Sequence, residues 1–341
     1  MICEIKFAPL LFALFLLLGT SGAQSAEPTS TMVIQEPWSN VFGGKDAIFH
    51  ARFTADESFD GRIVWRYAAD GRTIARGERA VKAGPSAPGI TEVCFSVPPV
   101  KPGVIIQTTL SICAVSSGSD KEIANLDKTL WVFPDDPFAG RAEWLKALKI
   151  RLFDPSGATA KLFTEAGIPF TETRNSDALE GGGDSLLIVG EGVSFKEYRG
   201  LAANLIKAAA AGQSVLCLSP DSGDILLPGT EDSALPQPLS LVFSRRDFIK
   251  QLDKRLDAAW RHPVGQAGES GLKLRGNRGS VIVEIAKDGG GWPLMETRYD
   301  KGHGKFVICG FGIVGAWADS PTPRFFLVKV LEHVSGNKMK E

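Results

Sequence analysis

The stretch from residue 184 to residue 223 restricts the fold more than any other part of this chain. It contains an apolar run at residues 186–189, an amphipathic helical pattern at 195–209 and a second apolar run at 215–218, and glycine or proline closes each segment. Short apolar runs of this kind are typical of parallel strands that are buried on both faces. The sequence therefore predicts a β-α-β unit here.

The same alternation extends from residue 149 to about residue 335. The sequence predicts strands at 150–153 and 168–172, a helix at 158–167, a hairpin made from 293–299 and 305–309, a helix from Ser244 to Trp260 and a final helix from Pro321 to about Val334. Alternating strands and helices indicate a doubly wound α/β sheet of flavodoxin-like type over residues 149–335.

A different pattern covers residues 32–134. Apolar and polar residues alternate with a period of two in short runs, and glycine and proline turns separate the runs. This pattern predicts an antiparallel β-sandwich of immunoglobulin-like type, with Trp65 in its core and His50 on its outer face beside Arg52. Residues 135–148 follow as a proline- and aspartate-rich linker, with a short helix starting near Ala142.

The first residues have the pattern of a secretory signal. Lys6 precedes the apolar run 7–18, and the small residues 21–23 follow it. Because this run is shorter than the roughly 20 apolar residues that span a bilayer, we expect a signal peptide over residues 1–23 rather than an uncleaved anchor. The mature protein is then secreted or periplasmic.

Charge and cysteine content exclude several classes of protein. A formal net charge of −1, with both signs interspersed, gives no electrostatic surface for nucleic acid or an anionic membrane. No cysteine or histidine spacing resembles a metal site. Cys94 and Cys113 each lie on the face of a strand opposite its apolar residues, so the sequence allows a cross-strand disulfide if these strands are neighbours. Cys217 and Cys309 lie inside apolar strands and are expected to be buried.

Ligands of an open α/β sheet bind beyond the carboxyl ends of its strands. The residues at those positions are Asp154, Gly190 to Gly192 with Glu191 between them, Ser219 to Gly223 with Asp221 among them, and Gly310 to Gly315. Trp317, just after the last of these turns, is either a platform for a sugar ring or a packing residue. The glycine pattern matches neither a dinucleotide fingerprint nor a phosphate loop, so no cofactor is predicted.

One family resemblance follows from the order of these segments. A strand that ends at Gly190, a crossover helix, a strand that ends at Ser219 and the segment 304–311 follow one another within residues 145–333. This order resembles the class I glutamine amidotransferase-like fold, including degenerate versions that follow β-sandwiches in secreted bacterial glycosidase-like proteins. The resemblance implies a nucleophilic cysteine in the turn after the fourth strand and a His-x-Glu pair after the late strand. Here those turns begin with Ser219 and Phe311, so both catalytic positions are empty.

Three functions remain open at this level. The empty positions favour a non-catalytic accessory protein that binds carbohydrate or a cell-envelope protein. A hydrolase of glycans or peptidoglycan requires two of Asp154, Glu191 and Asp221 to converge, and a serine mechanism requires Ser219 or Ser222 to meet His262 or His303. A structural or oligomerisation module is the third alternative.

Overall fold

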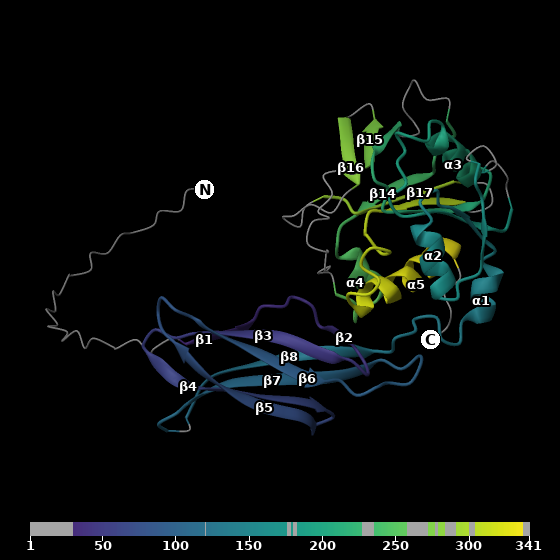
Figure 1. Ribbon diagram of the computed structural model, residues 1–341. Helices are drawn as coiled ribbons and strands as arrows, with labels where there is room; N and C mark the ends of the chain where they lie inside the picture. Colours follow the sequence, from purple (N-terminus) through teal and green to yellow (C-terminus); the bar gives the residue numbers. More distant parts are fainter. Residues whose placement is uncertain are drawn as a thin grey trace, which may run out of the picture.

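The computed structural model describes most of the chain after the first 29 residues (Figure 1). The described residues are 30–119, 121–175, 179, 183–226, 235–257, 272–276, 279–283, 291–299 and 304–336. The predicted signal peptide, the cleavage site and the last three residues, 258–260, of the helix expected at 244–260 lie outside these residues. Within them, no helix is both long and apolar enough to cross a membrane.

Residues 31–133 form two sheets. One has three antiparallel strands in the order β1-β3-β6, and the other has five strands in the order β2-β8-β7-β4-β5. Their bounds are β1 Thr31–Ile34, β2 Asn40–Phe42, β3 Asp46–Thr54, β4 Phe59–Ala69, β5 Arg72–Ala83, β6 Gly89–Ser96, β7 Ile106–Ser116 and β8 Glu122–Phe133. One hydrophobic cluster joins the two sheets, so this part of the chain is a β-sandwich.

The period-two pattern places the core of the sandwich. In β6, buried and exposed residues alternate from Gly89 to Ser96, and in β4 Trp65 is only 7% exposed, as predicted. His50 lies half-buried on the outer side and pairs with Glu36 at 2.6 Å. The predicted alternation therefore sorts side chains correctly between core and surface.

The predicted disulfide between Cys94 and Cys113 is not formed. Both residues are free thiols. Cys94 lies on β6 of the three-stranded sheet and Cys113 on β7 of the five-stranded sheet, and each alternates with core residues. The two thiols therefore face outward from opposite sides of the sandwich. The alternation of apolar and polar residues predicts which face of its strand each cysteine lies on, but it does not predict which strands are neighbours.

The second part of the chain is organised around a seven-stranded sheet with the order β10-β9-β11-β12-β18-β17-β14. The first five of these strands are parallel, and the hairpin of β17 and β18 adds antiparallel pairs. The bounds are β9 Ile150–Phe153, β10 Phe170–Glu172, β11 Leu186–Val189, β12 Ser214–Leu218, β14 Ser240–Ser244, β17 Leu294–Arg298 and β18 Lys305–Cys309. The predicted strands and the hairpin are confirmed, whereas β14 was not predicted.

Both faces of the central strands β11, β12 and β18 are buried, which explains their unbroken apolar runs. In β11, Leu186 and Ile188 pack into one cluster, while Leu187 and Val189 pack into another on the opposite face. The first cluster is shared with helices α1 Ala142–Ala147, α2 Ala158–Glu165 and α5 Pro321–Ser335. The second is shared with helix α3 Leu201–Ala210 and with a small sheet of β13 Gly223–Leu226, β15 Leu272–Gly276 and β16 Gly279–Val283.

One helix prediction was wrong in its length. Helix α4 spans only Phe248–Leu252, and no side chain caps its first turn. The chain leaves the helix because the carboxylate of Asp253 accepts hydrogen bonds from the main-chain and side-chain nitrogens of Arg255. A local side-chain bond of this kind competes with continuation of a helix.

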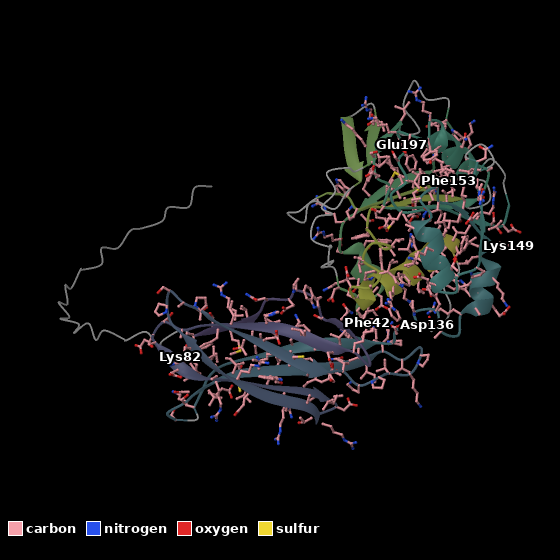
Figure 2. All side chains as sticks on the ribbon, viewed as in Figure 1. Phe42, Lys82, Asp136, Lys149, Phe153 and Glu197 are labelled. Carbon is pink, nitrogen blue, oxygen red and sulfur yellow. The ribbon has the colours of Figure 1, made fainter. Side chains whose placement is uncertain are left out.

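Polar contacts join the sandwich to the α/β part. The buried carboxylate of Asp257 accepts hydrogen bonds from the amides of Ser39 at 2.6 Å and Asn40 at 3.0 Å. The Asn40 side chain donates to the Arg255 carbonyl at 2.7 Å and accepts from the Thr322 hydroxyl at 3.2 Å. Phe42 and Asp136, labelled in Figure 2, mark this junction. The division into two domains at residues 135–148 stays a prediction, but the two parts share hydrogen bonds.

A buried carboxylate ties α5 to the sheet. Glu296 of β17 forms hydrogen bonds with His333 of α5 and with Arg298. Burial opposes ionisation of Glu296, but these hydrogen bonds outweigh it and lower the pKa of Glu296 from 4.5 to about 2.

Replacement of Glu296 should therefore change stability in acid. Because the folded-state pKa is the lower one, the unfolded chain takes up a proton first, so this contribution is complete above about pH 4.5 and is lost as the pH falls toward 2. Its upper bound is roughly 3 kcal/mol. Denaturant unfolding at several pH values should show a shallower loss in acid for Glu296→Gln than for the wild type. The same substitution at the exposed Glu197 should leave the slope unchanged, and an equal effect of both would contradict the assignment.

Candidate functional site

The carboxyl ends of β9 and β11 form the point where the strand order of the large sheet reverses. Asp154 follows β9 and Gly190 follows β11, and a methyl group added at Gly190 would lie only 2.6 Å from the Asp154 carboxylate. Glycine is therefore needed for this close approach. The structure places two predicted site positions side by side, at the place where ligands of doubly wound sheets bind.

The Asp154 carboxylate accepts hydrogen bonds at the start of helix α2, which follows it. Oδ2 accepts the amide of Ala160 at 2.8 Å, and Oδ1 accepts the hydroxyl of Ser156 at 2.8 Å. The amide of Ala160 lies in the first turn of α2, where main-chain amides have no partner inside the helix. Asp154 thus stabilises the start of α2.

Glu191 is the most deeply engaged carboxylate at this edge. Its Oε2 accepts the amide of Val314 at 2.7 Å and its Oε1 accepts the amide of Gly315 at 2.9 Å, while its own amide binds the Thr159 hydroxyl at 2.9 Å. Burial raises the pKa of Glu191, and the amides of residues 313–315 partly offset that rise. The side chain holds the turn after β18 against the turn after β11.

Ser219 and Asp221 follow β12 at the same edge. Ser219 has a φ of 30°, a conformation that is uncommon for a residue other than glycine. Its amide donates to the Cys309 carbonyl at 2.6 Å, and its hydroxyl donates to the Gly310 carbonyl at 3.4 Å. Asp221 is exposed and accepts the Ser222 hydroxyl at 3.3 Å. This turn is bound to its neighbour β18 by its main chain.

Two of the described thiols border these turns but are buried, and both described imidazoles are paired elsewhere. Cys217 and Cys309 are fully buried in their strands, and burial raises the pKa of both thiols, that of Cys309 to about 12. The two described histidines pair elsewhere, His50 with Glu36 and His333 with Glu296. His262 and His303, the partners considered for a serine mechanism, lie outside the described residues.

Trp317 belongs to the junction rather than to the sheet edge. Its carbonyl accepts the Nε of Arg324 at 2.8 Å, and its ring centre lies 5.5 Å from the same guanidinium. Arg324 also lies 4.6 Å from the ring centre of Phe42 in the sandwich and donates to the Asp135 carbonyl at 2.8 Å. These are packing contacts, and a role of Trp317 as a sugar platform stays a prediction.

A cavity of about 300 Å³ with a mixed polar and apolar lining lies beside this junction. It is lined by a loop of the sandwich, by the linker, by the turn after α4 and by α5. Its charged lining residues are Asp136, Arg141, Asp253, Arg255 and Lys329. Sequence reasoning missed this site because its residues come from four distant segments and no local motif connects them. Within the described ranges, no group of three or more metal-ligating side chains is present.

Comparison with known proteins gives no family for this chain. No family model and no curated protein matches it. Solved structures with partial likeness include fibronectin(III)-like modules of Clostridium thermocellum CbhA, at 16% identity and a TM-score of 0.21, covering 30% of this chain and 98% of the module. A Paenibacillus sp. cycloisomaltooligosaccharide glucanotransferase, solved with cycloisomaltoheptaose, matches at 10% identity and a TM-score of 0.25, over 54% of this chain and 27% of that protein. At such TM-scores these likenesses assign no function, and nothing in them supports the amidotransferase resemblance.

Substitution of Glu191 tests whether it holds the two turns together. Glu191→Gln places an amide group against the main-chain donors of Val314 and Gly315, so at least one hydrogen bond is lost and stability should fall by about 1–3 kcal/mol. Hydrogen exchange at the amides of Val314 and Gly315 should accelerate more than exchange in β12. The matched control is Asp221→Asn, which is exposed and should have little effect. Unchanged exchange in Glu191→Gln would show that the carboxylate does not hold this turn.

Proposed function

We propose that this chain is an exported, non-catalytic accessory protein that binds carbohydrate. The observation that carries the proposal is the engagement of Glu191, whose two carboxylate oxygens both bind main-chain amides of the turn after β18. A carboxylate that acts as nucleophile or general base must be able to reach a substrate atom or a water. Both oxygens of Glu191 are instead bound to the amides of Val314 and Gly315, at the edge of the sheet where a catalytic carboxylate would be expected.

The proposal includes a flavodoxin-like, amidotransferase-like arrangement for the second part of the chain and an immunoglobulin-like one for the first. The order β10-β9-β11-β12-β18 supports the former, because it corresponds to the flavodoxin-like order in which the second strand lies outside the first. In such an arrangement the turn after β12 would carry the nucleophile. Here it carries Ser219, whose described polar partners are main-chain groups.

Binding without turnover is the expected result of a direct test. The mature chain is titrated calorimetrically with maltoheptaose, cellopentaose, xylopentaose and chitopentaose, and each mixture is then analysed by chromatography after long incubation. Saturable binding of at least one oligosaccharide, with no new products, supports the proposal. Cleavage that disappears in both Asp154→Asn and Glu191→Gln would establish a hydrolase instead. Absence of binding to every sugar, together with a stable multimer in light scattering, would favour a structural module.

A further inference from the structure

The cavity beside the junction combines an apolar wall with ordered charged groups. Ile105, Phe325 and Val328 supply apolar surface, and Arg141, Arg255 and Lys329 supply cations. Phe325 is held by the ring of Phe133, with the ring centres 4.7 Å apart. A volume of about 300 Å³ is at the lower end of the range for small-molecule sites and suits a mono- or disaccharide unit.

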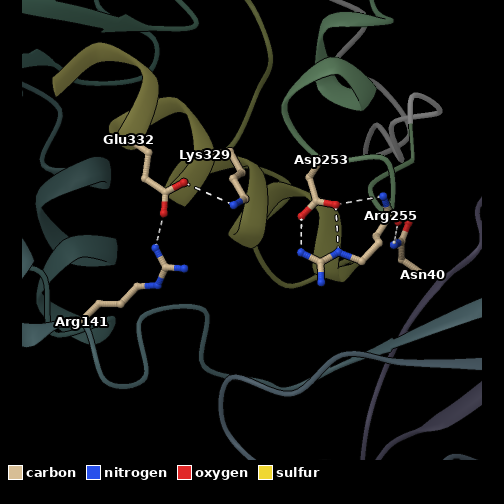
Figure 3. A network of polar contacts seen from close by, with 6 residues as sticks. All are labelled: Asn40, Arg141, Asp253, Arg255, Lys329 and Glu332. Carbon is tan, nitrogen blue, oxygen red and sulfur yellow. Dashed lines mark hydrogen bonds and ion pairs between the residues drawn. The ribbon is translucent and has the colours of Figure 1, made fainter. Parts of the chain in front are cut away.

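Each cation of the cavity is paired with a carboxylate (Figure 3). Arg255 binds Asp253 through two parallel contacts of 2.8 and 2.9 Å. Glu332 of α5 lies between Arg141 and Lys329 and binds both, the latter at 3.3 Å. Asp136 also lines the cavity, so three carboxylates and three cations surround it and their formal charges sum to zero.

These charged side chains are also fixed in place. Asn40 of the sandwich binds the main-chain carbonyl of Arg255 at 2.7 Å, and the Asp253 carboxylate holds both the amide and the guanidinium of the same residue. Burial opposes ionisation of Asp253, but the hydrogen bonds from Arg255 outweigh it and lower the pKa of this carboxyl. Fixed donors and acceptors lower the entropic cost of binding.

We propose that this cavity is a binding site for a neutral sugar unit; the inference rests on the proposed carbohydrate-binding function and assigns its site. Hydroxyl groups both donate and accept hydrogen bonds, so they can bind the paired carboxylates and cations without separating them. An anionic ligand would have to compete with Asp253 or Glu332 for its cation. The C–H face of a sugar ring packs against Ile105, Phe325 and Val328.

The first variant blocks the cavity without removing its ion pairs. Ala139 lines the cavity from the linker and is partly exposed, so Ala139→Trp should fill the space while the chain stays folded. Ala318→Trp is the matched control, because Ala318 is exposed and lines a separate groove of about 230 Å³ at the same junction. A second variant, Lys329→Met, keeps most of the side-chain volume and removes the ammonium group.

Calorimetric titration uses the neutral oligosaccharides named above and, for comparison, an oligogalacturonate. Ala139→Trp should abolish binding and Lys329→Met should weaken it by about tenfold or more, while Ala318→Trp binds like the wild type. Binding of the neutral sugar should change little with added NaCl. Circular dichroism and the Tm confirm that each variant is folded.

Different results would contradict the cavity as the binding site and carbohydrate binding as the function. If the wild type binds a sugar but Ala139→Trp and Lys329→Met bind it equally well, the cavity assignment is wrong and the proposed function stands. If Ala318→Trp alone loses binding, the site is the other groove. Tighter, salt-dependent binding of the oligogalacturonate would overturn the choice of a neutral ligand. A wild type that binds no sugar overturns the proposed function itself.

Discussion

The buried carboxylate of Asp257 is the contact on which the arrangement of this molecule depends. It accepts the amides of Ser39 and Asn40, which lie at the entry to β2, and its own amide approaches the Thr322 hydroxyl at the start of α5. Burial raises the pKa of Asp257, and the two amides partly offset that rise. A buried acceptor that lost its donors would be costly, so the sandwich and α5 are held in a fixed relation. The cavity beside them keeps its shape for the same reason.

The regular elements could be predicted because their cause is local. In β11 and β12 every residue from Leu186 to Val189 and from Val215 to Leu218 is buried. A short run that is apolar on both faces is typical of a central strand of a parallel sheet, so its structure could be predicted from the run itself. The helix α5 begins at Pro321 for a comparable reason, since proline suits the first turn of a helix. In the sandwich, the alternation of core and surface positions follows from the pleat alone.

What the sequence did not reveal depends on long-range pairing. Strand β14 exists because it pairs with β17, and its residues carry only a short apolar pattern of their own. Cys94 and Cys113 were placed on the correct faces, yet their sheets are different ones. Glu191 was placed at this edge of the sheet, but its role follows from amides that lie 123 and 124 residues away. The junction cavity needs four segments at once, and no spacing in the sequence indicates it.

The separation in sequence between Asp257 and its partners also affects how the chain can acquire its structure. The hydrogen bond from Asn40 spans 217 residues, and that from Ser39 spans 218. The sandwich can form most of its strand-to-strand hydrogen bonds from its own residues. The amides of Ser39 and Asn40 can bind the Asp257 carboxylate only when the turn after α4 is in place. Contacts that close such long loops form late, because the loop entropy must be lost before they contribute. Assembly of the cavity is therefore expected to be among the last folding events, after both hydrophobic cores have collapsed.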